Sequence, residues 1–200
     1  MRVLVTGVSG LVGRTAAARF AGRGDEVVGF SRTAPLELPT GVSFVRGDVL
    51  DPDALARAFA TFDGIDLLVH SAFALDSREG VEQMRRVNVD GTANVIAAAE
   101  AAGVKRAIFM SSVTVYGPRV DPEQTASTEA RQLTPHPQHP YALHKVECER
   151  LFGQSSLPSV LVRAGIVLGR GTDHRLREAL AARRHMVSTG PQYPWGVIHH

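Results

Sequence analysis

Cysteine and lysine are scarce in this chain of 200 residues. The single cysteine, Cys148, excludes an internal disulfide, and on its predicted helix it is expected to be a half-buried apolar residue rather than a nucleophile. Lys105 and Lys145 are the two lysines; the other basic residues are arginines spread along the sequence. With a net charge of +2 and no basic cluster, a nucleic-acid-binding surface is not expected.

Long apolar runs are also missing. No run approaches the roughly 18 residues that span a bilayer, so association with a membrane is not expected. The sequence begins directly with a segment typical of a strand, without the features of a signal peptide, which predicts a cytoplasmic protein. There is no internal repeat or low-complexity tract.

Short apolar segments alternate with Ala-rich segments along the chain. The apolar segments are nearly continuous, which is typical of parallel strands covered by helices on both faces. We therefore predict an α/β fold with a doubly wound parallel sheet (a Rossmann fold) and the strand order 3-2-1-4-5-6. The expected strands are 2–7, 26–31, 42–48, 65–72, 105–112 and 159–167, and the expected helices are 11–23, 51–60, 79–102 and 141–153.

Two segments depart from this alternation. Residues 118–140 contain five prolines and are too long for an ordinary connection, which predicts a functional loop. Its histidines, His136 and His139, lie among prolines with no cysteine nearby, so a solvated loop is favoured over a metal site. The final residues, "PQYPWGVIHH", lead toward a further strand, which suggests a piece of a longer protein.

Three glycines, Gly7, Gly10 and Gly13, lie between the first predicted strand and the first predicted helix. Gly7 would permit a sharp turn, Gly10 would leave room for a pyrophosphate, and Gly13 would let the helix pack closely on the sheet. The anion would lie at the helix N-terminus, where unpaired N–H groups and the helix dipole favour it. The pattern predicts a dinucleotide site, and a glycine-rich turn without a ligand is the alternative.

The spacing of these glycines, T-G-x-x-G-x-x-G, resembles that of the extended short-chain dehydrogenase/reductase superfamily, the branch of NAD(P)-dependent epimerases and dehydratases. A second motif supports the resemblance: Ser112 ends the fifth predicted strand, and Tyr141-x-x-x-Lys145 opens the next helix. A Tyr-x-x-x-Lys arises by chance in about 3% of chains of this composition. The resemblance covers essentially the whole chain and implies a Rossmann domain at 1–163, followed by the start of a substrate-binding portion at 164–200.

The chemistry of hydride transfer explains this choice of residues. Transfer between a carbinol carbon and a nicotinamide requires that the hydroxyl lose or gain a proton. A phenol has a pKa of about 10, too high for a base at neutral pH, and a neighbouring ammonium lowers that pKa. Tyr141 and Lys145 are four residues apart and share a helix face. On this resemblance Tyr141 is the acid–base group, Lys145 also holds the nicotinamide ribose, and Ser112 donates a hydrogen bond to the substrate oxygen.

The end of the second predicted strand has Ser31 and Arg32 where NAD-binding members usually carry an acid. A guanidinium offers paired donors to a phosphate, so NADP is preferred over NAD; an ordinary surface arginine is the alternative. Asp48 and Val49 resemble the pair that contacts adenine, and Phe73 replaces a small residue in the turn beneath the cofactor. The cofactor-binding residues implied by the resemblance are Gly7, Ser9, Gly10, Leu11, Val12, Gly13, Ser31, Arg32, Asp48, Val49, Ser71, Ala72, Phe73, Asn88, Ser111, Tyr141 and Lys145.

The resemblance implies an oxidoreductase-type enzyme, an epimerase (or reductase) acting on a nucleotide sugar. A ketone, aldehyde or hydroxysteroid-type reductase is the second reading, and a non-catalytic dinucleotide sensor is the third, which the intact Tyr and Lys disfavour. Dehydration is disfavoured because Val113 and Thr114 follow the serine where dehydratases carry an acid. His70 is expected to be structural; Asn88 either steadies the active site or is a surface amide. A homodimer is expected from the family.

Overall fold

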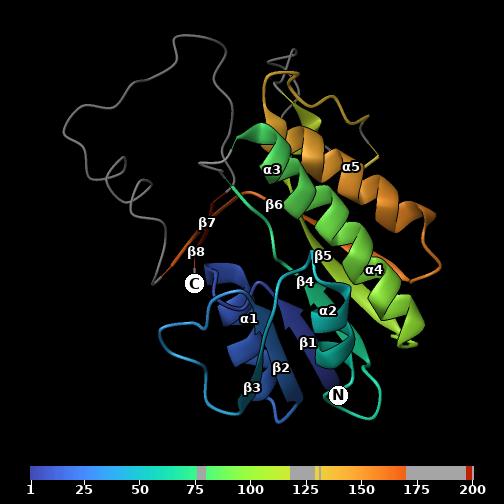
Figure 1. The fold of residues 1–200 in the computed structure, drawn as a ribbon. Helices are drawn as coiled ribbons and strands as arrows, with labels where there is room; N and C mark the ends of the chain where they lie inside the picture. Colours follow the sequence, from blue (N-terminus) through green and yellow to red (C-terminus); the bar gives the residue numbers. More distant parts are fainter. Residues whose placement is uncertain (76–79, 118–128, 131, 170–196, 200) are drawn as a thin grey trace.

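The computed structural model describes residues 1–75, 80–117, 129–130, 132–169 and 197–199. Its centre is a six-stranded sheet in the order β3-β2-β1-β4-β5-β6, in which every neighbouring pair is parallel (Figure 1). The predicted doubly wound topology is therefore confirmed. The strands are β1 (Arg2–Thr6), β2 (Glu26–Ser31), β3 (Val42–Arg46), β4 (Leu67–His70), β5 (Arg106–Ser112) and β6 (Ser159–Ala164).

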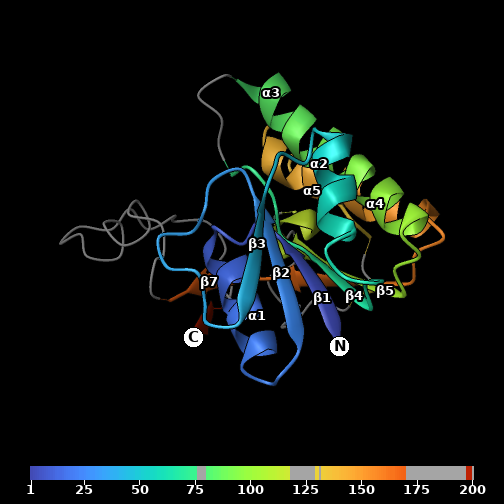
Figure 2. The same cartoon turned by 60° about the horizontal axis from the view of Figure 1, so that its bottom comes forward.

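Helices cover the two faces of the sheet unequally. One face packs on α1, whereas α2, α4 and α5 pack on the other, each face with its own apolar core (Figure 2). The Asp51 side chain accepts hydrogen bonds from the N–H groups of Asp53 (3.0 Å) and Ala54 (3.1 Å), so it caps α2 just before the proline at its first position. The helices are α1 (Leu11–Ala21), α2 (Pro52–Phe59), α3 (Val81–Arg85), α4 (Gly91–Ala101) and α5 (Pro140–Gln154).

The helix predicted over 79–102 is not uniform. Between α3 and α4 the chain forms a π-helical turn, η1 (Arg86–Asp90). Such turns within helices are frequent at functional sites, and this one carries the buried Asn88. Hydrophobic periodicity does not distinguish one wide turn from the α-helix around it, so the sequence does not reveal the interruption.

The strand predicted over 159–167 is divided. β6 ends at Ala164, which pairs with Ser112 where β5 also ends. The chain then forms β7 (Ile166–Leu168), which pairs in parallel with β8 (Val197–His199) in a separate two-stranded sheet. Much of the predicted loop at 118–140, and most of the portion at 164–200, lies outside the described residues.

Candidate active site

A cavity of about 210 Å³ lies at the carboxyl ends of β1 to β4, the edge at which parallel sheets of this topology bind ligands. Main chain and small side chains form most of its wall. It is lined by the loop after β1 (Gly7, Ser9, Gly10), the end of β2 (Phe30, Ser31, Arg32, Thr33), the end of β3 (Gly47, Asp48, Val49), the turn after β4 (Ser71, Ala72, Phe73, Ala74) and Val87.

The three glycines of the loop have different surroundings. Gly7 has φ +73°, and a Cβ on it would lie 2.6 Å from the backbone N of Ala72. A Cβ on Gly13 would lie 2.3 Å from the carbonyl oxygen of Gly7, because α1 packs tightly on the loop. A Cβ on Gly10 would meet nothing nearer than 3.4 Å. Gly7 and Gly13 are therefore required by the fold, whereas a Cβ on Gly10 would make only an ordinary van der Waals contact with the Gly7 carbonyl oxygen.

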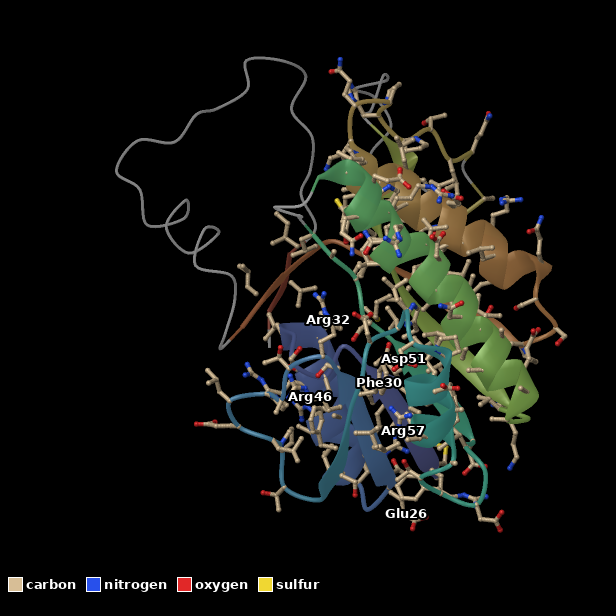
Figure 3. All side chains as sticks on the ribbon, in the orientation of Figure 1. Glu26, Phe30, Arg32, Arg46, Asp51 and Arg57 are labelled. Atoms are coloured by element: carbon tan, nitrogen blue, oxygen red, sulfur yellow. The ribbon has the colours of Figure 1, made fainter. Side chains whose placement is uncertain are left out.

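Two arginines lie close together where β2 and β3 end (Figure 3). Arg46 pairs in register with Ser31, and its Nε donates a hydrogen bond to the carbonyl oxygen of Arg32 (3.0 Å). Ser31 is buried, and its hydroxyl donates to the carbonyl of Thr33 (2.8 Å). Both arginines are exposed, and within the described ranges neither forms an ion pair. Arg32 lines the cavity and Arg46 lies beside it, so two guanidinium groups without a carboxylate partner in the described residues meet at this rim of the cavity.

The structure brings Ser112 and Tyr141 together at the end of β5. Ser112 caps a short 3₁₀ helix, η2 (Val113–Tyr116), and its Oγ accepts hydrogen bonds from the Thr114 N–H (3.2 Å) and hydroxyl (2.9 Å). Tyr141 lies near Ser112 in the first turn of α5. Burial raises the pKa of Tyr141, and the nearby Ser112 hydroxyl opposes that rise. The expected lowering of this pKa by an ammonium is not seen.

Lys145 is 2% exposed, and its amine faces rings rather than the cavity. Its Nζ donates a hydrogen bond to the carbonyl oxygen of Met110. The Nζ lies 3.4 Å from the ring centroid of Phe73, 4.7 Å from that of Phe109 and 5.5 Å from that of Tyr141. Burial lowers the pKa of Lys145 to about 7. The amine is therefore next to Tyr141, as its place one helical turn away requires, but it is enclosed.

His70 is buried at the end of β4 between two hydroxyls. Its Nδ1 lies 2.7 Å from the Thr6 Oγ1 and its Nε2 lies 2.9 Å from the Thr92 Oγ1. Because the Thr92 hydroxyl donates to the Asn88 carbonyl, it accepts from Nε2–H, and Nδ1 then accepts from Thr6. Burial lowers the pKa of His70 to about 3, with the charge of Lys145 as a smaller cause. Both ring nitrogens of a neutral imidazole are thus satisfied, as a structural residue requires.

Asn88 and Ser111 bond to the protein rather than lining the cavity. The Asn88 side chain accepts from the Ala74 N–H (2.6 Å) and donates to the Ala74 carbonyl (3.0 Å), so it fixes the turn after β4. The Ser111 hydroxyl donates to the carboxylate of Glu149 on α5. Glu149 also binds the Arg163 guanidinium through Oε1 (3.0 Å) and Oε2 (2.7 Å). No local sequence pattern indicates this ion pair.

The sequence-based cofactor residues thus fall into two groups. Those in the glycine loop and at the ends of β2, β3 and β4 line the cavity, except for the helix residues Leu11, Val12 and Gly13. Asn88, Ser111, Tyr141 and Lys145 are not among the lining residues. Lining residues that were missed are Phe30, Thr33, Gly47, Ala74 and Val87.

The sequence profile of the NAD dependent epimerase/dehydratase family matches residues 3–196, nearly the whole chain. The chain belongs to this family. A crystal structure of a short-chain dehydrogenase/reductase superfamily protein from Agrobacterium tumefaciens with bound NAD has the same fold, with a TM-score of 0.72 and 33% sequence identity. The match covers 84% of this chain and 50% of that chain.

Two curated relatives in this family differ in activity. The 2-alkyl-3-oxoalkanoate reductase of Stenotrophomonas maltophilia is 32% identical over 187 residues, which cover 92% of this chain and 56% of that protein. The UDP-glucose 4-epimerase of Streptomyces lividans is 32% identical over 159 residues, which cover 75% of this chain and 46% of that protein. The chain spans about half the length of these curated relatives.

Within the described residues, no helix is both long and apolar enough to cross a bilayer. Nor does that part of the chain bring together three His, Cys, Asp or Glu side chains that could hold a metal ion, and this includes His136 and His139.

Proposed function

We propose that this chain is the cofactor-binding and catalytic part of an NAD(P)-dependent enzyme that moves a hydride at a carbinol or ketone carbon. The observation that carries the proposal is that Ser112 and Tyr141 lie together beside the buried amine of Lys145, at the carboxyl edge of the sheet that also holds the cavity. Tyr141 exchanges the proton of the reacting oxygen, and Ser112 holds that oxygen by a hydrogen bond. The Lys145 amine lies 5.5 Å from the ring centroid of Tyr141, and when it carries its proton it favours the ionised phenol.

The cavity fits a dinucleotide. Gly7 and Gly10 line the cavity without side chains, so a ligand can approach the main chain of this loop. The N–H groups of Leu11, Val12 and Gly13 begin α1 and have no acceptor within the helix, so they suit a pyrophosphate. Asp48, one of the residues lining the wall, would face the adenosine half, as the resemblance implies. The bound dinucleotide would supply the hydride, or accept it.

The rim of this cavity supports NADP as the preferred dinucleotide. Ser31 carries no charge that would repel a 2′-phosphate, and Arg32 and Arg46 are free to bind one. An exposed guanidinium pair without a carboxylate partner is a ready phosphate site. The Agrobacterium tumefaciens protein was crystallised with bound NAD. The dissociation constants of the present chain for NAD and for NADP therefore test the proposed preference.

For the substrate we propose a nucleotide sugar, acted on by an epimerase, with a carbonyl reductase as the second candidate. The Streptomyces lividans relative supports the first and the Stenotrophomonas maltophilia relative supports the second. Val113 and Thr114 leave no carboxyl group directly after Ser112, which disfavours a dehydratase. Both readings use the same proton transfer at Tyr141.

The replacement Tyr141→Phe tests the proposal in the full-length protein. Removing one hydroxyl should abolish turnover, a loss of at least about 100-fold, because no other group exchanges the proton. Binding of NADP(H), followed by calorimetry, should persist. Substantial remaining turnover in the variant would reject Tyr141 as the acid–base group. If the wild-type protein bound NADP(H) but turned over no carbonyl compound or nucleotide sugar, a dinucleotide sensor would be favoured.

A further inference from the structure

Thr114 makes two hydrogen bonds to the oxygen of Ser112. The Ser112 Oγ accepts one from the Thr114 N–H (3.2 Å) and one from the Thr114 hydroxyl (2.9 Å). A serine hydroxyl has two acceptor lone pairs and one proton. Both lone pairs of Ser112 are therefore occupied by the same residue, and its proton is left to be donated to another group. Tyr141 lies near this hydroxyl, which opposes the rise that burial causes in the Tyr141 pKa.

We propose that Thr114 is a positioning residue: its hydroxyl holds the Ser112 side chain so that the Ser112 proton points toward Tyr141 and the reacting oxygen. The inference rests on the proposed function in so far as Ser112 is the donor to that oxygen. The Thr114 hydroxyl disfavours other directions of the Ser112 O–H bond. It also makes Ser112 a stronger donor, because hydrogen bonds in a chain polarise one another.

The backbone and side-chain contributions of Thr114 can be separated. Ser112 caps the short helix η2, and the bond from the Thr114 N–H belongs to that cap. Any residue except proline would supply this N–H. The second bond requires a hydroxyl at position 114. Thr114→Val keeps the N–H and the shape of the side chain, so this variant removes the second bond alone.

The other end of η2 is held independently of Ser112. The Thr134 hydroxyl donates to the carbonyl oxygen of Tyr116 (2.8 Å), and the Arg163 Nη1 donates to the Tyr116 hydroxyl (2.7 Å). Tyr116 is buried, so this end of the short helix is fixed by packing as well. Thr134→Val is therefore a matched control: it removes a threonine hydroxyl from the same short helix, at the end that does not carry Thr114.

The pKa of the phenol at position 141 reports the direction of the Ser112 proton without substrate or dinucleotide. In the full-length protein Tyr141 is replaced by 3,5-difluorotyrosine, whose phenol ionises near neutral pH, and the phenolate absorbance is followed against pH. Ser112→Ala should raise this pKa by at least about one unit, because the ionised phenol loses a donor. Thr114→Val should raise it by about half a unit, and Thr114→Ser should restore the wild-type value.

A double-mutant cycle decides whether Thr114 acts through Ser112. In the Ser112→Ala protein, Thr114→Val should change the pKa no further. Thr134→Val should leave the pKa at its wild-type value. In the described residues, Lys145 and His139 are titratable groups beside the Tyr141 ring, and both remain in every variant.

Three results would overturn the proposal. If Thr114→Val left the pKa unchanged or lowered it, Ser112 would be donating to the Thr114 oxygen instead. If the effect of Thr114→Val persisted without the Ser112 hydroxyl, it would act by another route. If Thr134→Val raised the pKa equally, loosening of η2 would be the cause.

The turnover of Tyr141→Phe remains the separate test of the proposed function. If the pKa values follow the expected order while Tyr141→Phe keeps its turnover, the positioning by Thr114 stands and the proposed function falls. If Tyr141→Phe is inactive while Thr114→Val leaves the pKa unchanged, the proposed function stands and the positioning by Thr114 falls.

Discussion

The two ends of the sheet's carboxyl edge hold their charges in different ways. Beside β2 and β3, Arg32 and Arg46 are exposed, and no carboxylate pairs with either in the described part of the chain. Beside β5 and β6, Lys145 and Glu149 are buried, and Arg163 is 17% exposed. Exposed charges cost the fold little and remain available to a ligand. Buried charges need partners within the protein, so removing one of these partners lowers the stability of the fold.

The largest effect is expected at the buried ion pair. Glu149→Ala leaves Arg163 without its carboxylate and Ser111 without its acceptor. Removing one partner of a buried pair costs about 3–5 kcal/mol. Urea unfolding followed by circular dichroism should show a loss of this size.

Glu147→Ala, two residues earlier on α5, is the matched control. Glu147 pairs with Arg85 at 2.5 Å, but its side chain is 31% exposed. Its removal should cost no more than about 1 kcal/mol. If the two variants lost equal free energy of unfolding, burial would not explain why a buried ion pair contributes more to stability than an exposed one.

A smaller effect is expected from pH at His70. Its folded pKa of about 3 lies below the unfolded value of about 6.5. Between these values the unfolded chain binds more protons, so stability falls as pH decreases through this window. From pH 7 to pH 5 the loss from this one residue should be about 2 kcal/mol.

The slope of unfolding free energy against pH measures this effect. It should flatten in His70→Gln, which cannot take up the proton when the chain unfolds. A wild-type slope in His70→Gln would mean that His70 is not neutral in the folded protein.

The same division marks what the sequence could predict. The sheet order and the glycine loop follow from local patterns: apolar runs, and glycines at a turn. The spacing of the glycines predicted a tight turn followed by a closely packed helix. Gly7 and Gly13 are sterically necessary for this, because a Cβ on either would clash with backbone atoms. The sequence predicted Arg32 at the end of the second strand but not Arg46 beside it. Arg46 comes close because β3 pairs with β2.

The end of the edge that holds Tyr141 and Lys145 was predicted only as a motif. Tyr-x-x-x-Lys placed Tyr141 and Lys145 on one helix, but the rings around the amine come from β5 and from the turn after β4. The partners Glu149 and Arg163 come from α5 and β6. Contacts between distant segments are set by tertiary packing, and no local pattern encodes them.

The smallest effect is expected at the exposed rim, and it concerns binding rather than stability. Arg46→Ala and Arg32→Ala should each weaken NADPH about tenfold, about 1.4 kcal/mol, because each guanidinium offers charge-assisted hydrogen bonds to a 2′-phosphate. NADH lacks that phosphate and should bind as before. The loss should shrink at high salt, since exposed charges are screened. Arg57→Ala, on α2 and away from the cavity (Figure 3), should change neither dinucleotide. Equal weakening of NADPH and NADH in the Arg32 and Arg46 variants would mean that the rim supports the loop after β2 and does not select the cofactor.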